Sequence, residues 1–289
     1  MEYQVTHVTR YESKDPVSVC HNQAWLTPRT EGPQVCTGHE MVVVPEPSTW
    51  SQRSDAFGNT VTHFSINGGY TVLEVRARSR VSLQPSSPAD PSTSPNWESI
   101  AQSLREGQES WELDPFRFDS PRVLRTESLR SFASEHFVAD RPILEALTDL
   151  TARIFEEFEY DPQATTVTTP TSEVFERKRG VCQDFAHLQI GMLRSLGLAA
   201  RYVSGYVRTQ PPEGQERLIG ADASHAWLSI YCGEELGWID VDPTNNSFPS
   251  EEHVTLSWGR DYGDVAPLRG VYTGGSQHRL SVSVDLRPV

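Results

Sequence analysis

The sequence lacks paired cysteines and long apolar runs, and each absence excludes a class of protein. Its four cysteines, at positions 20, 36, 182 and 232, form no CxxC pair. A disulfide framework or a cysteine-rich zinc site is therefore not expected, and the expected compartment is the cytoplasm, although a Cys20–Cys36 bridge stays possible in an oxidising one. No stretch of about 18 apolar residues could span a bilayer, and no signal peptide is recognisable, so no membrane partner is expected.

Clusters of basic residues are also missing. Lys and Arg number 25 against 39 Asp and Glu, which gives a formal net charge of -14. Because nucleic-acid binders present a basic stripe, we expect no nucleic-acid partner. The nine histidines are scattered, so the sequence predicts neither a metal site nor a cofactor. With 289 residues, of which 37% are hydrophobic, the chain is long enough for two cores of a soluble protein.

Residues 1–82 combine short β-prone segments with turn signals, and we predict that they form an N-terminal β-sandwich. Segments rich in Val, Thr, Tyr and Phe are typical of strands. These segments are Tyr3–Tyr11, Glu40–Val44, Thr60–Ile66 and Leu73–Val81. A turn signal at residues 55–59 separates two of them. Residues 83–96 carry four prolines and few large apolar side chains, which is typical of a linker.

Residues 97–289 are predicted to form a second, mixed domain, which makes the fold class α+β. Apolar side chains at spacings of three and four predict amphipathic helices, after which the pattern changes to strands. The expected helices are Asn96–Leu104, Glu127–Phe137, Arg141–Phe158 and Cys182–Leu196, and the expected strands are Ala200–Arg208, His225–Tyr231, Gly237–Val241 and Leu280–Leu286. We place the last strands, from about residue 250 onward, in this second domain.

Cys182 stands at the opening of a predicted helix, two residues after Gly180. Unpaired backbone N–H groups and the helix dipole favour a thiolate there, and the same N–H groups can hold an oxyanion. A lone cysteine is more often a buried structural residue. His225 at a strand start and Asp242 at the next strand's end change that balance, because a cysteine nucleophile needs a base and the base needs an orienting group.

The segments around these three residues resemble the transglutaminase-like superfamily, whose members share Gly-x-Cys on a helix, His-x-Trp on a strand and Asp-Pro-Thr on the next. The resemblance implies that Cys182 is the nucleophile, His225 the base and Asp242 the orienting acid of a papain-like core. Residues 26–29, 55–59 and 258–265 are similar to the bacterial branch. The resemblance therefore covers nearly the whole chain.

One departure from the family concerns the oxyanion. Animal members use a tryptophan upstream of the cysteine, and this chain has none between residues 112 and 181. Tyr160 is the nearest polar aromatic and is our candidate donor, although a tyrosine there could equally pack on the core. His187, Asp184 and Arg201 are interpreted as structural residues, because His187 lies on another side of the helix from Cys182.

We therefore expect cysteine-dependent acyl transfer on a peptide or protein amide through a thioester, without a cofactor. Resolution by water would make the protein a protease or amidase, which we favour because no device for excluding water is recognisable. Resolution by an amine would make it a transglutaminase. A non-catalytic interaction module that retains the fold is the alternative from another class. The oligomeric state is not predictable from these residues.

Overall fold

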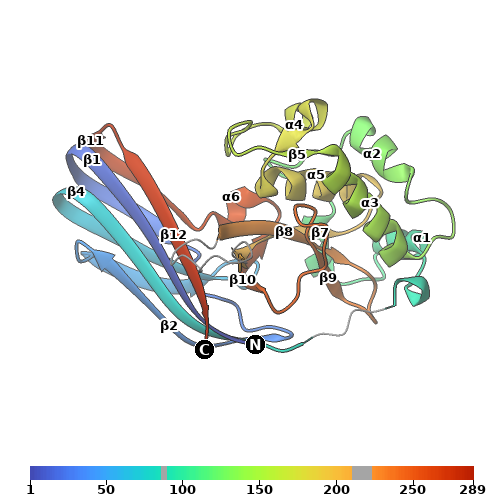
Figure 1. The fold of residues 1–289 in the computed structure, drawn as a ribbon, viewed down its shortest axis with the longest axis horizontal. Coiled ribbons are helices and arrows are strands. Elements are labelled where there is room, and N and C mark those ends of the chain that lie inside the picture. Colours follow the sequence, from blue (N-terminus) through green and yellow to red (C-terminus); the bar gives the residue numbers. More distant parts are fainter. Residues whose placement is uncertain (86–89, 210–222) are drawn as a thin grey trace, which may run out of the picture.

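The computed structural model describes residues 1–85, 90–209 and 223–289 of the chain. A strand-rich unit occupies one end of the molecule and a unit of helices packed on a smaller sheet occupies the other (Figure 1). The α+β class and the strand-rich N-terminal region predicted from the sequence are thus confirmed. None of the helices in the described part of the chain is long and apolar enough to cross a membrane.

The first unit is one antiparallel sheet of six strands. Its strands are β1 (Glu2–Ala24), β2 (Gln34–Val44), β3 (Thr49–Ser54), β4 (Thr60–Leu83), β11 (Leu268–Ser276) and β12 (Arg279–Pro288). The order is β11-β1-β4-β2, with β12 also on β1 and β3 also on β4. The two segments predicted at Thr60–Ile66 and Leu73–Val81 are parts of the single strand β4, because Gly68 and Gly69 continue the strand instead of ending it.

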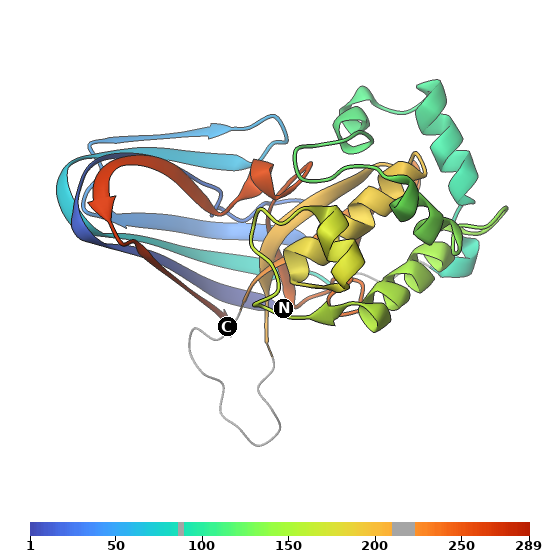
Figure 2. The ribbon, with the colours of Figure 1, turned by 90° about the horizontal axis from the view of Figure 1, so that it is seen from above.

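The last two strands of the chain complete this first sheet. β11 pairs with the second half of β1, and β12 pairs with its first half. The expectation that these strands belong to the second domain is therefore wrong, because local patterns do not reveal which distant strand a segment pairs with. The backbone N–H of Val289 donates to the carbonyl of Glu2 at 3.0 Å. Both chain ends therefore lie side by side, as the two views show (Figures 1 and 2).

The core of the first unit draws on both halves of its long strands. Irregular pairing between Glu12 and Val19 interrupts the β1–β4 register, which lets the strands bend. Buried side chains from either side of this point then pack together. They are Val17, Cys20, Ala24, Leu26, Val43, Phe64, Ile66, Leu73, Val75 and Ala77. In place of the expected β-sandwich, the described residues of this unit form one continuous sheet, because the long strands β1 and β4 run through it from end to end.

The second unit carries the helices. They are α1 (Trp97–Glu106), α2 (Glu127–Ser134), α3 (Ile143–Glu157), α4 (Thr171–Arg177), α5 (Cys182–Ser195) and α6 (Tyr262–Val265), with 3₁₀ turns at Pro91–Thr93 and Trp111–Phe116. Its four-stranded sheet has the order β10-β7-β8-β9, and β5 pairs with β6. These strands are β5 (Glu159–Tyr160), β6 (Arg179–Gly180), β7 (Ala200–Val207), β8 (Ala223–Tyr231), β9 (Trp238–Val241) and β10 (His253–Gly259). Helix α5 packs on β7 and β8, with α3 and α4 beside it (Figure 2).

The two units share a buried interface. Apolar side chains of β1, β4 and β12 pack against those of β7 and β10. They are Tyr3, Val5, Val81, Leu83, Tyr206, Val254, Leu256, Val284 and Leu286. Within it the ring of His7 is 2.9 Å from the Tyr206 hydroxyl and 2.7 Å from that of Thr9. Burial lowers the pKa of His7 to about 4, so this histidine is neutral at neutral pH.

Stacked cations and aromatic rings also link the two units at this interface. The guanidinium carbons of Arg29, from the first unit, and Arg201, from β7, each lie 3.5 Å from the Trp258 ring centroid. Cations attract the negative face of an aromatic ring, so Trp258 links the units. Asn59 adds hydrogen bonds to the Trp258 backbone. The turn predicted at residues 55–59 therefore also serves as a docking element between the units.

The chain passes from the first unit to the second between β4 and α1. Part of the predicted linker, residues 86–89, lies outside the described residues, and Pro91–Thr93 forms a 3₁₀ turn capped by Asp90. Its Ser94 hydroxyl accepts a hydrogen bond from the N–H of Leu144 at 3.1 Å. The end of the linker is thereby fixed to the start of α3.

Candidate functional site

The start of helix α5 is shaped by a glycine and an aspartate. Asp184 accepts the N–H of Val181 at 2.9 Å and the hydroxyl of Thr165 at 2.6 Å, which caps the helix. A Cβ on Gly180 would lie 2.7 Å from the Asp184 carboxylate, so only glycine leaves room for this cap. The sequence analysis interpreted Asp184 as structural, and it has that position here.

Cys182 is the first residue of this capped helix and its side chain is only partly buried. The N–H groups at Cys182 and Gln183 have no partner within the helix, because the first turn precedes the first i→i−4 bond. A negative charge at this position is favoured by these donors and by the helix dipole. The thiol therefore lies where a thiolate and an oxyanion can both be stabilised.

His225 of β8 lies between this thiol and a carboxylate. Its Nε2 is 2.6 Å from Oδ2 of Asp242, and the Cys182 thiol lies close enough to the ring to raise the pKa of His225. Because Nε2 is occupied by the carboxylate, Nδ1 is the nitrogen left for the thiol. Burial alone would lower the pKa of His225, but the hydrogen bonds to Asp242 and Cys182 outweigh it and raise the pKa to about 10. The imidazolium form is thus stabilised at neutral pH.

Asp242 follows β9 directly and is completely buried. Its Oδ1 accepts the backbone N–H of Thr244 at 2.9 Å and that of Asn245 at 3.3 Å. Its Oδ2 accepts the Asn245 amide at 2.6 Å. Burial raises its pKa, but the bonds from His225, His253 and Asn245 outweigh this and hold the pKa well below its usual range. The carboxylate therefore stays ionised and cannot rotate freely.

A second histidine reaches the same carboxylate, and the sequence analysis missed it. His253, the first residue of β10, has its Nε2 3.2 Å from Oδ2 of Asp242. Its side chain is 9% exposed. No motif surrounds His253 in the sequence, and only the pairing of β10 with β7 brings it to the site.

Among the described residues, a group of side chains that could hold a metal ion consists of His225, Asp242 and His253. Their ligand atoms all lie within 4.8 Å of one another. Two imidazoles and one carboxylate are a donor set that zinc accepts. Here, however, His225 and His253 both hydrogen-bond to the Oδ2 of Asp242, an arrangement that needs no ion. The chemistry of the set thus fits a hydrogen-bonded carboxylate at least as well as a metal.

Asp240, two residues before Asp242, faces other partners. It accepts the indole N–H of Trp227 at 3.0 Å and bonds the hydroxyl of Ser229. Neither of its oxygens contacts His225 among the described interactions. The geometry therefore separates the two aspartates, because Asp242 contacts the imidazole of His225 whereas Asp240 contacts Trp227 and Ser229.

Tyr160 lies on β5, which pairs in parallel with β6 so that Tyr160 is opposite Gly180. Its side chain is 54% exposed. Burial raises its pKa and so does the nearby charge of Cys182, which places its hydroxyl in the field of the thiol. It keeps its proton at neutral pH and can donate it in a hydrogen bond.

His187 and Arg201 have structural surroundings, as the sequence analysis interpreted them. His187 accepts the backbone N–H of Tyr262 at 3.1 Å, and its burial lowers its pKa to about 3. It points away from the thiol as a neutral acceptor. Arg201 stacks on Trp258 and on Trp238. Burial lowers its pKa to about 9 despite the opposing charge of Asp240.

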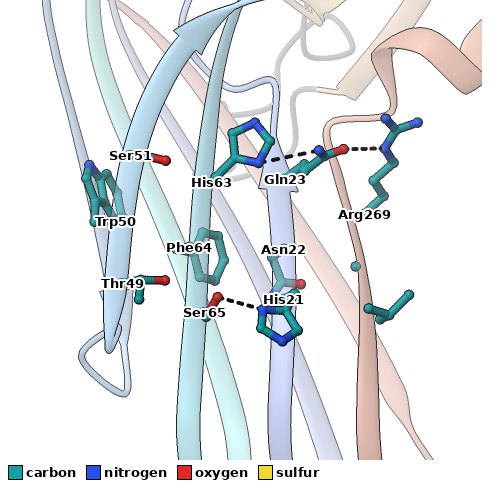
Figure 3. A pocket seen from close by; sticks show the side chains of 12 residues that line it. His21, Asn22, Gln23, Thr49, Trp50, Ser51, His63, Phe64, Ser65 and Arg269 are labelled. Carbon is teal, nitrogen blue, oxygen red and sulfur yellow. Dashed lines mark hydrogen bonds between the residues drawn. The ribbon is translucent and has the colours of Figure 1, made fainter.

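The first unit has a groove of about 500 Å³ across β1, β3, β4 and β11, on a different sheet from the triad (Figure 3). A hydrogen-bonded row crosses it, in which Gln23 joins His63 to Arg269. The ring of His21 is 2.7 Å from the Ser65 hydroxyl. Among the described residues that line the groove there is no carboxylate, so none of them can orient this Ser–His pair as the third member of a triad.

In comparisons with known proteins, two family models match two separate parts of the chain. The model of the transglutaminase-like superfamily matches residues 130–243, and that of the bacterial transglutaminase-like N-terminal region matches residues 3–82. An uncharacterised protein of Mycobacterium tuberculosis is 37% identical over 294 residues, which is 99% of this chain and 92% of the relative. One of Mycobacterium leprae is 30% identical, over 98% and 97%.

Two further matches concern proteins with a described activity. A protein-glutamine gamma-glutamyltransferase of Pseudomonas aeruginosa is 32% identical over 108 residues, which is 35% of this chain and 16% of that protein. A solved structure from Cytophaga hutchinsonii, described as a candidate cysteine protease, superposes with a TM-score of 0.75 at 18% identity. It covers 99% of this chain and 98% of its own, so the whole fold is shared.

Proposed function

This chain belongs to the transglutaminase-like superfamily, and on that premise we propose that it is a cysteine-dependent acyl-transfer enzyme acting on peptide or glutamine-type amides. The observation that carries the proposal is the position of His225 between the Cys182 thiol and the Asp242 carboxylate. A histidine so placed takes the thiol proton and is held in one tautomer.

The reaction proceeds in two steps. The Cys182 thiolate attacks the amide carbon, and the oxyanion forms beside the N–H groups of Cys182 and Gln183. His225, protonated by the thiol, gives that proton to the leaving amine, and a thioester remains. In the second step the neutral His225 takes a proton from the acceptor, which attacks the thioester and frees Cys182 as a thiolate. Asp242 stabilises the imidazolium that is present before the first proton transfer and again after the second.

Hydrolysis is the outcome that we propose for the second step. Cys182 is only partly buried and Tyr160 is half-exposed, so water has access to the thioester. A protease or amidase working on soluble peptide substrates in the cytoplasm fits this exposure, and no cofactor takes part in the proposed steps.

Amine transfer is the second candidate, supported by one specific observation. The match to the Pseudomonas aeruginosa protein-glutamine gamma-glutamyltransferase covers about a third of this chain. If that activity is shared, the thioester is resolved by a primary amine and two proteins become cross-linked. The triad serves both outcomes equally, because both begin with the same thioester.

The test uses glutamine-containing peptides with and without a primary amine. Mass spectrometry separates the three products, which are a cleaved peptide, a deamidated peptide and an amine adduct. We expect cleavage or deamidation in every sample and little adduct. A dominant adduct would instead establish amine transfer. EDTA is expected to leave the rate unchanged and iodoacetamide to abolish it. A Cys182 thiol no more reactive to iodoacetamide than Cys36 would contradict acyl transfer and favour the non-catalytic alternative.

A further inference from the structure

We propose that His253 is a positioning residue of the site: as a hydrogen-bond donor to Asp242, it fixes the carboxylate and limits how strongly that carboxylate holds the proton of His225. The inference rests on the proposed function, because it concerns the same thiol–imidazole pair.

The hydrogen bonds of Asp242 determine which nitrogen of His253 carries a proton. An ionised carboxylate only accepts hydrogen bonds, and Asp242 stays ionised because His225, His253 and Asn245 outweigh its burial and hold its pKa low. The Nε2 of His253, 3.2 Å from Oδ2, must therefore be the donor. Its Nδ1 is buried and has no hydrogen-bond partner among the described residues.

The unpartnered Nδ1 leaves Nε2 as the nitrogen through which His253 acts on the site. Among the described residues, the ring therefore has one hydrogen bond to lose, which is the one that it donates to Asp242. A substitution that removes this donor tests that single bond.

The ring of His253 is held in place by its neighbours. Trp227 packs edge-on against it, with ring centroids 5.2 Å apart. The Trp227 indole N–H is in turn fixed by Asp240 at 3.0 Å. A path of contacts therefore runs from Asp240 through Trp227 to His253 and on to Asp242. Asp240 and Asp242 thus both hold the histidines in place: Asp242 bonds His225 and His253 directly, and Asp240 acts on His253 through Trp227.

The negative charge of the Asp242 carboxylate is therefore divided among several hydrogen-bond donors. Its Oδ2 has three partners, which are His225, Asn245 and His253. Each donor takes part of the negative charge and so weakens the pull of Asp242 on the His225 proton. His225 must release this proton to the leaving amine, so too strong a pull slows that step. Without the His253 donor, we expect the imidazolium of His225 to persist to higher pH.

Other charged groups near His253 are few in the described part of the chain. Asp242 and His225 face it from the strands beside it. Glu251 and Glu252 precede it on its own segment, where Glu251 pairs with the N-terminal amine and the Glu252 carbonyl accepts the N–H of Arg208. A substitution at position 253 removes none of these groups.

The test compares His253→Gln with His253→Asn in the full-length protein. The amide nitrogen of glutamine can occupy the place of Nε2 and reach Asp242, whereas that of asparagine matches Nδ1 and is too short. Both variants are polar and uncharged, so they differ chiefly in this hydrogen bond. The readouts are kcat and KM on an amide substrate, and the pH dependence of Cys182 alkylation by iodoacetamide, which needs no substrate.

We expect His253→Gln to keep kcat within roughly threefold of the wild type. His253→Asn should lower kcat about tenfold or more at unchanged KM, and should move the alkaline limb of the alkylation profile up by about half a pH unit or more, the size expected for one lost hydrogen bond. If His253→Asn does not fold, His253→Met provides the same loss of the donor.

Three results separate the possible failures. A wild-type Cys182 without enhanced reactivity would overturn the proposed function. A reactive wild type whose alkylation profile and kcat are the same in His253→Asn would overturn the role of His253 alone. A loss of kcat equal in both variants would also overturn it, because the glutamine donor should have rescued the activity.

Discussion

His225 and Asp242 are 17 residues apart in the chain, yet Nε2 and Oδ2 of their side chains lie 2.6 Å apart. Strands β8 and β9 are antiparallel, with Leu228 opposite Val241. The end of β9 therefore lies near the start of β8, where His225 is found. Strands β8 and β9 position His225 and Asp242, and the capped helix α5 positions the Cys182 thiol. All three side chains are therefore held by rigid elements of the fold.

The first prediction compares the two aspartates. Asp242→Asn should lower kcat/KM by about 10⁴-fold, the scale of the equivalent change in a serine triad, because the amide favours the wrong tautomer of His225. Asp240→Asn should cost roughly tenfold or less in rate, together with about 1–3 kcal/mol of stability from its bonds to Trp227 and Ser229. Steady-state kinetics and thermal unfolding of both variants decide it. A larger kinetic loss for Asp240→Asn would contradict the assignment.

Replacing the thiol gives the second prediction. Cys182→Ala should abolish amide turnover while leaving the unfolding temperature close to that of the wild type, because alanine suits a helix start sterically and the Asp184 cap remains. Cys36→Ala is the matched control, since Cys36 is also a partly buried free thiol but lies on β2. Its activity should be unchanged. Residual turnover above a few per cent in Cys182→Ala would refute the nucleophile.

Tyr160 carries the third prediction. If its hydroxyl donates to the oxyanion, Tyr160→Phe should lower kcat by about 100-fold, the lower end for one lost donor, with little change in KM. Tyr272→Phe, an exposed tyrosine on β11, is the control. An unchanged kcat in Tyr160→Phe would leave stabilisation of the oxyanion to the backbone N–H groups of α5.

Acid sensitivity is the fourth prediction. The pKa of His7 is about 4 in the folded protein because of burial, and near 6.5 in the unfolded chain. Between these values the unfolded state binds more protons, so stability is full above about pH 6.5 and falls by about 3 kcal/mol as the pH drops to 4. His7→Gln should remove this part of the slope, while the slope from the buried His187 remains. Denaturant unfolding at several pH values measures both slopes, and identical slopes would show that His7 does not contribute.

The fifth prediction concerns the strand that joins the two units. Leu286 of β12 is fully buried in the shared interface, so Leu286→Ala should cost about 2–5 kcal/mol of stability. Leu280→Ala, on the same strand but 54% exposed, should cost about 0.5 kcal/mol or less. Calorimetry compares them. Equal shifts in unfolding temperature would mean that β12 does not hold the units together.

Local patterns in the sequence predict those features that depend on neighbouring residues. The helix expected at Cys182–Leu196 is observed as Cys182–Ser195, because Gly180 and Asp184 define its start locally. Arg141–Phe158 was expected as a helix and α3 covers Ile143–Glu157, because its apolar spacing is regular. The short motifs around His225 and Asp242 lie on adjacent strands, so the same local reasoning identifies both candidates.

Features that depend on distant pairing could not be predicted in this way. The strand containing Leu280–Leu286 was recognised as a strand, but its partner β1 begins at Glu2, and no local signal links the two. His253 was missed for the same reason, since its contact with Asp242 follows from the pairing of β10 with β7. The all-exposed strand β3 was missed because it has no buried alternate positions.

The order of synthesis has a consequence for the first sheet. β1 is made first, but its partners β11 and β12 leave the ribosome only after the whole helical unit. Until then one edge of β1 exposes unpaired backbone groups, the kind of edge that invites pairing with other chains. The shared interface also lacks Val284 and Leu286 at that stage. A nascent chain that lacks β11 and β12 thus carries the complete thiol–imidazole–carboxylate set while its first sheet is still incomplete, so the folding of that sheet depends on these two strands.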